Sequence, residues 1–232
     1  MISKAPRAGV CKTRLCPPLT QVEAARLARA FVLDALATIR QARLDPRVMC
    51  RGASERIALK KLIGPAGMVS IQRGDGLGAA LESAFRDGVT EGCKAVAVLA
   101  PDSPTLPPAV LREAFAALDD GADLALGPSE DGGYYLLAAR GVHSRLFRDM
   151  PWSTGWVASE TLERCSALGL SVHILPVWYD VDEAGSLARL YEELPGAARS
   201  LALHTRCELA MRVVLRIPQA TTALGMRAGA SV

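Results

Sequence analysis

Several features that are common in membrane, secreted and zinc-binding proteins are missing from this sequence. No apolar run approaches the roughly 18 residues that a membrane-spanning helix needs, and no basic-then-apolar signal segment opens the chain. The six cysteines are scattered without a C-x-x-C pair, which favours free thiols in a reducing compartment over disulfides or a zinc site. We therefore expect a cytoplasmic protein without a membrane span.

A strong excess of charge of either sign is also missing. The formal net charge is +3, and the basic residues are spread along the chain rather than gathered in one run. This balance argues against nucleic acid as the main partner and is compatible with a small anionic substrate. It leaves the oligomeric state open.

Three familiar catalytic patterns are absent as well. His143, His173 and His204 lie in no metal-ligand spacing. Ser103 is not part of a G-x-S-x-G motif, which disfavours a serine hydrolase. No glycine immediately precedes Lys12, so the basic segment around it is not a Walker P-loop.

What the 232 residues do contain is a regular alternation of predicted strands and helices. Short apolar or β-branched runs predict strands at 48–50, 68–71, 95–100, 124–126, 134–138 and 172–175. Amphipathic stretches predict helices after the capping-box pair Thr20 and Glu23, from a Ser54 cap to 62, from 78 to 89, and at 107–118, 157–168 and 184–194. The alternation predicts an α/β sandwich with a mostly parallel sheet.

The length fits one substantial domain, which we place at residues 1–196. Residues 197–232 are expected to form a C-terminal extension, part of it disordered. The reason is that periodicity weakens from about Ala210 and the chain ends in small residues.

Four aspartates follow predicted strands or sit in a tight glycine turn. Asp102 comes directly after the strand at 95–100, Asp180 and Asp182 follow a later strand, and Asp131 lies in a Glu-Asp-Gly-Gly turn. In open α/β sheets, ligands bind beyond the carboxyl ends of the strands, and carboxylate oxygens suit Mg²⁺ or Mn²⁺. One such aspartate alone is better explained as a turn former, but four together favour a site.

The loop from Lys4 to Leu15 carries four cations and a glycine, Gly9. Such a loop can surround phosphates, with backbone N–H groups and the side chains of Lys12 and Arg14 sharing the charge. It can equally be a solvated basic loop. Only Met1 to Ser3 precede it, which leaves room for a short first strand.

Two further segments allow a structural and a binding interpretation. The turn that contains Gly76 and Gly78 leads into a helix, so its glycines either form a turn or let a ligand approach the helix N-terminus. Ser153, before the helix at 157–168, is a plausible N-cap, and the neighbouring Trp152 could instead cover a ring of the substrate.

Taken together, the motifs resemble a bacterial GT-A-like family of nucleotide-diphospho-sugar transferases. That group includes uncharacterised and arsenosugar-biosynthesis-type glycosyltransferases, and it is distantly similar to molybdenum-cofactor and phospholactate guanylyltransferases. The matching pieces appear in family order: Lys4-x-Pro6-x-x-Gly9-x-x-Lys12-Thr13-Arg14-Leu15, Gly76-Leu77-Gly78, Asp102-Ser103-Pro104-Thr105-Leu106, Gly127-Pro128-x-x-Asp131-Gly132-Gly133-Tyr134-Tyr135, Trp152-Ser153-Thr154 and Asp180-Val181-Asp182.

The resemblance implies a three-layer α/β/α sandwich, the Rossmann-like nucleotide-diphospho-sugar transferase fold, with a mostly parallel mixed sheet. It implies that Asp102 and Asp131 are catalytic, and that Mg²⁺ or Mn²⁺ is held by Asp102, Asp180 and Asp182. The substrate would contact the remaining motif residues, which are Lys4, Gly9, Lys12, Arg14, Gly76, Gly78, Ser103, Gly132, Gly133, Trp152 and Ser153. The family pattern carries an arginine where this chain has Ala80.

Three functions are compatible with these residues. The leading hypothesis is a metal-dependent transferase that moves a sugar from a nucleotide-diphosphate-sugar to an unknown acceptor. The first alternative is a nucleotidyltransferase that joins an NTP to a phosphorylated metabolite and releases pyrophosphate. The second, motivated by the short first strand and Ala80, is a nucleotide-binding protein without turnover.

Overall fold

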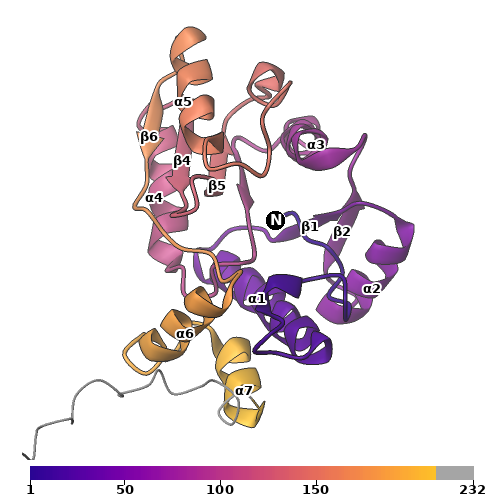
Figure 1. Cartoon of the computed structure of the whole chain (residues 1–232). Helices are drawn as coiled ribbons and strands as arrows, with labels where there is room; N and C mark the ends of the chain where they lie inside the picture. Colours follow the sequence, from indigo (N-terminus) through magenta and orange to yellow (C-terminus); the bar gives the residue numbers. More distant parts are fainter. Residues whose placement is uncertain (213–232) are drawn as a thin grey trace, which may run out of the picture.

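The computed structural model describes residues 1–212, and in it helices cover both faces of two β-sheets (Figure 1). This arrangement confirms the predicted α/β fold. The strands are β1 (Arg47–Cys50), β2 (Met68–Ile71), β3 (Val96–Leu99), β4 (Leu124–Pro128), β5 (Tyr134–Ala139) and β6 (Val172–Ile174). The helices are α1 (Gln21–Gln41), α2 (Ala53–Ile63), α3 (Gly76–Thr90), α4 (Pro108–Asp119), α5 (Val157–Ala167), α6 (Ala184–Glu193) and α7 (Leu203–Arg212).

The strands form a parallel pair, β1–β2, and a four-stranded mixed sheet in the order β3-β5-β4-β6. β6 runs parallel to β4, whereas β5 runs antiparallel to both β3 and β4. The antiparallel direction of β5 has a local cause. Only residues 129–133 connect β4 to β5, and a parallel connection needs a crossover of about a dozen residues or more.

The start of α1 is the element that the sequence predicts best. Thr20 Oγ1 accepts a hydrogen bond from the Glu23 N–H at 3.3 Å, and the Glu23 carboxylate accepts one from the Thr20 N–H at 2.8 Å. The predicted Ser54 cap of the next helix is wrong, because α2 begins at Ala53 and Gly52 stands at the N-cap position without a side-chain bond.

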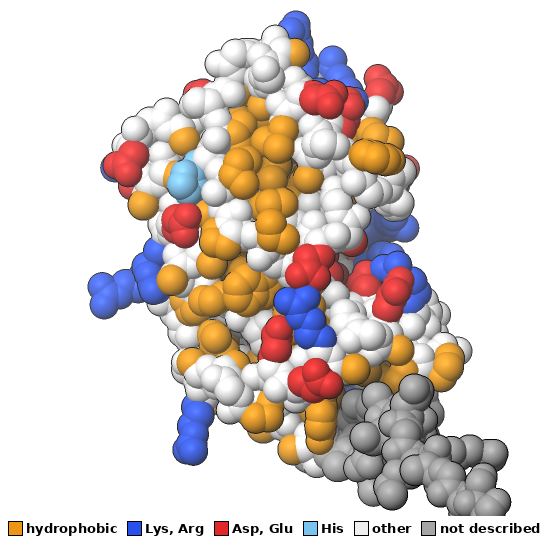
Figure 2. Space-filling model, turned by 60° about the vertical axis from the view of Figure 1, so that its left-hand side comes forward, with side chains coloured by type: hydrophobic (Ala, Val, Ile, Leu, Met, Phe, Trp, Pro, Cys, Tyr) orange, Lys and Arg blue, Asp and Glu red, His pale blue; other side chains and the backbone are white. Residues whose placement is uncertain are grey.

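Apolar side chains from the helices fill both sides of the sheet layer. On one side α1 and α4 contribute residues such as Leu36 and Leu111. On the other side Phe85 of α3 and Cys165 of α5 pack against the sheet. Apolar side chains also gather on the surface turned forward in Figure 2, and Ile174 of the edge strand β6 is 48% exposed.

The first part of the predicted C-terminal extension forms α7, which packs on α1. The Asp34 side chain, 2% exposed, accepts hydrogen bonds from the N–H groups of His204 and Thr205 and from the Thr205 hydroxyl. This carboxylate satisfies donors at the free N-terminus of α7. The rest of the predicted extension, residues 213–232, lies outside the described residues. Within residues 1–212, no helix combines the length and the apolarity needed to cross a membrane.

Candidate functional site

A cavity of about 670 Å³ lies where the N-terminal loop meets the start of α3 and the loops that follow β1, β2 and β3. Its position agrees with the rule that ligands bind beyond the carboxyl ends of strands. Eight residues of the predicted site line it: Lys4, Lys12, Arg14, Gly76, Asp102, Trp152, Ser153 and Asp182.

Lys12 is the central cation of this cavity. Its Nζ lies 2.6 Å from Asp102 Oδ1 and 2.5 Å from Asp182 Oδ1, and its side chain is only 7% exposed. The same Nζ lies 5.4 Å from the centroid of the Phe31 ring. The backbone of Lys12 is left-handed, with φ 51°, immediately before the short 3-10 helix Thr13–Leu15. One ammonium group therefore bridges two acids that are 80 residues apart in the sequence.

The charges of Lys12, its two acidic partners and Arg14 depend on one another. Burial by itself would lower the pKa of Lys12, but the Asp102 and Asp182 carboxylates outweigh burial and raise the pKa above its ordinary value. Burial would likewise raise the pKa of Asp182, but Lys12 and Arg14 outweigh it and hold the pKa below its ordinary value. The Arg14 guanidinium pairs with Asp182 and also lies 3.2 Å from Glu183.

The backbone holds the two acidic loops together. The Val181 N–H donates to the Asp102 carbonyl at 2.9 Å, and the Asp182 N–H donates to Ser186 Oγ at 3.0 Å. The positions of the two carboxylates are therefore fixed by main-chain contacts as well as by Lys12.

Asp180 pairs with Ser103 rather than with Lys12. The Ser103 hydroxyl lies 2.8 Å from Asp180 Oδ1 and 2.9 Å from the Tyr179 carbonyl. Burial is the main cause that raises the pKa of Asp180 to about 6, and the nearby Asp102 and Asp131 charges add to the rise against the Ser103 hydrogen bond. Neither Asp180 nor Ser103 belongs to the cavity lining within residues 1–212.

Asp131 forms the turn between β4 and β5. Its Oδ1 accepts hydrogen bonds from the Ser129 hydroxyl and, at 2.9 Å, from the Gly133 N–H. Gly132 has φ +84°, and a Cβ placed on it would lie 2.0 Å from the Gly155 carbonyl oxygen. The structure therefore gives these residues contacts that shape the turn, and among the described residues they lie outside the cavity lining.

The other two glycines outside the lining also make packing contacts. A Cβ on Gly78 would lie 2.8 Å from the Phe147 carbonyl oxygen and 3.1 Å from Trp152 Nε1, so this glycine brings α3 close to the segment that carries Trp152. Gly9, with φ +75°, approaches the Gln21 side chain at the start of α1.

The carboxylates provide the right chemistry for a divalent cation but are arranged around an ammonium group. Asp102 and Asp182 direct one oxygen each at a shared cation position, and such oxygens are ligands that Mg²⁺ and Mn²⁺ accept. Lys12 takes that position, and Asp180 is turned to Ser103. Within residues 1–212 no group of three or more His, Cys, Asp or Glu side chains is arranged to hold a metal ion.

Arg51 and Gln72 are among the polar lining residues that the sequence-based prediction missed. Arg51 follows β1 directly and Gln72 follows β2 directly, and both line the cavity. The Gln72 side chain donates to the carbonyls of Gly74 and Gly76 at 2.8 and 3.2 Å, so it holds the glycine turn at the cavity edge. The rule of strand ends that identified Asp102 would have found both, had it been applied to the first two strands.

The sequence profile of a family described as "Uncharacterized protein conserved in bacteria (DUF2064)" matches residues 32–154, more than half of the chain. No curated protein matches this sequence.

Among solved structures, a candidate nucleotide-diphospho-sugar transferase from Desulfovibrio desulfuricans G20 is similar, with TM-score 0.84 and 29% identity, covering 92% of this chain and 94% of that one. A CMP:2-keto-3-deoxy-manno-octonic acid synthetase complexed with CTP has TM-score 0.50 and 13% identity, covering 72% and 88%. The first similarity supports the resemblance that the motifs predicted, and the second concerns the fold alone.

Proposed function

This chain belongs to the bacterial family DUF2064, and from that premise we propose that it is a transferase that uses a nucleotide-diphosphate-sugar as donor. The residues do not identify the acceptor. The observation that carries the proposal is the buried Lys12 ammonium, held between Asp102 and Asp182 in a cavity that Lys4, Arg14 and Arg51 also line. The similarity to the Desulfovibrio protein supports the same class of donor.

The main task of such an enzyme is to stabilise the charge that develops on the departing diphosphate. Lys12 and Arg14 come from one loop and reach the same acid, Asp182, so their charges already converge. Groups that are held in place before the reaction cost little reorganisation when the charge develops. We propose that these two side chains exchange carboxylate partners for phosphate oxygens when the donor binds.

Asp102 and Asp182 are the residues that would hold Mg²⁺ or Mn²⁺, because they present carboxylate oxygens to one cation position. A bound divalent cation would supply further positive charge to the diphosphate. In this proposal Asp131 shapes the acceptor side through its turn. Asp180, whose pKa is raised to about 6, is the proton acceptor.

Binding measurements test the proposal directly. Nucleoside diphosphates and nucleotide-diphosphate-sugars are titrated with and without Mn²⁺ into the parent, Lys12→Met and Asp102→Ala. We expect Lys12→Met to bind the tightest ligand at least about tenfold more weakly, since a buried charge-assisted bond is lost. The exposed Lys94 lies outside the cavity lining, so Lys94→Met is the matched control.

The result that contradicts the proposal is equally clear. If Lys12→Met and Asp102→Ala bind every ligand as the parent does, with and without Mn²⁺, the cavity is not the donor site. In that case the charges around Lys12 serve stability alone.

Nucleotidyl transfer is the second candidate, because the same fold occurs in a synthetase complexed with CTP. The products separate the two reactions. Released nucleoside diphosphate supports sugar transfer, whereas released pyrophosphate from an NTP supports nucleotidyl transfer. A nucleotide-binding protein without turnover is the third candidate, and hydrolysis of any nucleotide-sugar that stops on chelation would exclude it.

A further inference from the structure

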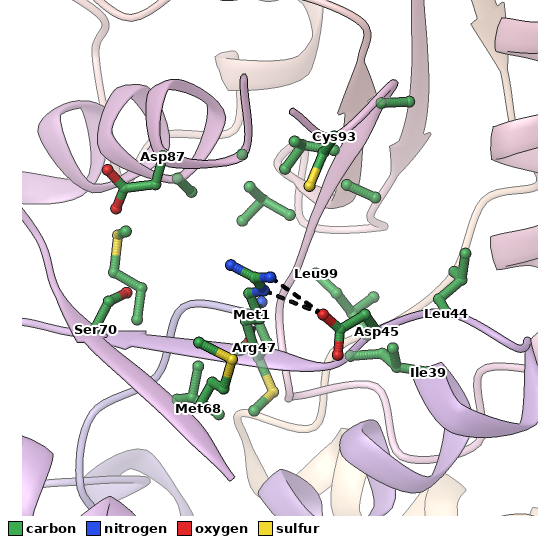
Figure 3. Close-up of a pocket in the computed structure, with 18 of the residues that line it drawn as sticks. Met1, Ile39, Leu44, Asp45, Arg47, Met68, Ser70, Asp87, Cys93 and Leu99 are labelled. Atoms are coloured by element: carbon green, nitrogen blue, oxygen red, sulfur yellow. Dashed lines mark hydrogen bonds and ion pairs between the residues drawn. The ribbon is translucent and has the colours of Figure 1, made fainter. Parts of the chain in front are cut away.

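The charged side chains around a cavity between β1 and β3 are paired with one another (Figure 3). The cavity measures about 270 Å³. Arg47, which helps to line it, pairs with Asp45 at 3.3 Å and with Glu91, and Asp87 pairs with Arg73. These charges stabilise one another and need no partner from outside. A different part of the surface carries cations without such partners.

This part of the surface lies on α2 and on the N-terminal loop. It consists of Ile57 and four exposed cations, Arg7, Arg56, Lys60 and Lys61, which together we call the α2 face. The Arg7 guanidinium donates to the Ser54 carbonyl at 3.2 Å, which brings the loop to the first turn of α2. In Figure 1, α2 lies at the right-hand edge of the molecule with this loop beside it.

Helical spacing places the cations of α2 around Ile57. Lys60 and Lys61 follow Ile57 by three and four residues, so they lie one turn farther along the same side of the helix. Arg56 lies four residues before Lys60, so two like charges are neighbours on the helix surface. Such a pair destabilises an isolated helix.

Acids do not neutralise the α2 face. Within residues 1–212 none of its four cations forms an ion pair. The single acid of α2 is Glu55, and its carboxylate accepts a hydrogen bond from the Arg51 N–H at 2.9 Å. The net charge of the whole chain is +3, so the four cations exceed it and the rest of the chain has no positive excess.

Helix stability explains only part of this pattern. Lys60 and Lys61 occupy the last turn of α2, where cations interact favourably with the helix C-terminus. This effect does not account for Arg56 or for Ile57. Ile57 is 69% exposed, and no aliphatic residue among residues 1–212 is more exposed. The face therefore combines unpaired positive charge with an apolar side chain that is left in water.

This combination fits an anionic bilayer better than it fits nucleic acid. Both partners offer phosphates to the cations, but the nucleic-acid backbone offers no apolar phase for Ile57. At a bilayer an apolar side chain enters the boundary between headgroups and acyl chains. The aliphatic stems of Lys60 and Lys61 can lie along that boundary while their ammonium groups stay at the phosphates.

We propose that the α2 face binds the surface of a membrane that contains anionic phospholipids. Ile57 enters the boundary between headgroups and acyl chains, and the four cations contact lipid phosphates. Arg51 and Glu55, next to this face, line the candidate donor cavity, so binding places the bilayer beside that cavity.

Vesicle binding by the full chain, without nucleotide, tests the proposal. The protein is sedimented with phosphatidylcholine vesicles that contain either no anionic lipid or about 30% phosphatidylglycerol, and we expect at least about 100-fold stronger binding to the anionic vesicles. Each cation near such a surface strengthens binding about fivefold, so Lys60→Gln/Lys61→Gln should bind about 25-fold more weakly. Ile57→Ser removes an apolar side chain from the bilayer and should bind about tenfold more weakly.

Matched variants elsewhere on the surface control for each change. Lys94→Gln/Arg199→Gln removes the same charge from two exposed residues outside the α2 face, and Ile174→Ser makes the same apolar-to-polar change at a residue that is 48% exposed. Both should bind the anionic vesicles as the parent does.

Three outcomes overturn the proposal. Equal binding of the parent to both kinds of vesicle, or binding to neither, shows that the face does not recognise anionic lipid. An equal loss in Lys94→Gln/Arg199→Gln shows that overall charge, and not this face, governs binding. If Ile57→Ser binds as the parent does, no apolar side chain enters the bilayer; duplex DNA binding that is lost in Lys60→Gln/Lys61→Gln would then assign the face to nucleic acid.

Discussion

Replacement of Asp180 by asparagine is expected to stabilise the protein while it impairs the reaction. The pKa of Asp180 rises from 3.8 to about 6, mainly because the carboxyl is buried and further because Asp102 and Asp131 lie nearby. At 1.36 kcal/mol per unit, this shift corresponds to about 3 kcal/mol of destabilisation when the group is ionised. Asparagine keeps an oxygen that can accept the Ser103 hydrogen bond, so Asp180→Asn removes the charge with little change in shape.

The sign of the pH dependence follows from the direction of this shift. The folded protein binds the proton of Asp180 more tightly than the unfolded chain does, so the destabilisation is complete above about pH 7. It decreases as the pH falls through 6 and vanishes below about 4. Urea unfolding should therefore show Asp180→Asn to be more stable than the parent by up to about 3 kcal/mol at pH 8, and nearly equal to it at pH 4.

Asp182→Asn is the matched control, because its pKa is shifted in the opposite direction. Lys12 and Arg14 hold the Asp182 pKa below its ordinary value despite burial, so ionised Asp182 stabilises the folded state, and this contribution is lost as the pH falls. Asp182→Asn should thus be less stable than the parent at pH 8. If Asp180→Asn gains nothing at pH 8, or gains the same amount at pH 4, burial does not control this carboxyl and the reasoning is refuted.

Two further predictions concern backbone packing and helix capping. Gly132→Ala should lower the free energy of unfolding in urea by about 3 kcal/mol or more, because its Cβ would lie 2.0 Å from the Gly155 carbonyl oxygen. Gly76→Ala is the control: at φ +83°, with nothing within 4 Å of the added Cβ, it should cost about 1–2 kcal/mol from backbone strain alone. Equal losses in the two variants would show that the contact at Gly155 yields easily. Asp34→Ala leaves three donors at the start of α7 without their acceptor, two of them buried on Thr205, and should cost about 3 kcal/mol and expose α7 to limited proteolysis. An unchanged midpoint and an unchanged digest would show that α7 is held by its apolar contacts.

The sequence predicts the elements of this fold well, because most of them follow from local patterns. The Thr20–Glu23 capping box and the apolar run of β3 each need only neighbouring residues to be recognised. The position of Asp102 at the cavity follows from one topological rule. The antiparallel direction of β5 is also predictable, since a connection of five residues cannot cross over a sheet.

Local sequence patterns do not predict which groups the site residues contact. A glycine motif looks the same in sequence whether it admits a ligand or another segment, and only the distances at Gly78 and Gly132 show packing against Phe147 and Gly155. Equally, Asp102, Asp180 and Asp182 all follow predicted strands and look equivalent in the sequence. In the structure Lys12 binds two of them, and Asp180 is left with Ser103.

The placement of Lys12 couples donor binding to the two carboxylates. While its ammonium lies 2.6 Å from Asp102 and 2.5 Å from Asp182, a divalent cation can enter only by displacing it. When phosphates draw Lys12 and Arg14 away, the carboxylates of Asp102 and Asp182 lose these cationic partners and then favour a divalent cation. Coupling between two ligands is reciprocal, so Mn²⁺ in turn should strengthen binding of the diphosphate. In Lys12→Met the carboxylates have no ammonium to displace, so Mn²⁺ alone should bind more tightly than to the parent in a direct titration; weaker binding would show that Lys12 holds the acids in place for the metal rather than competing with it.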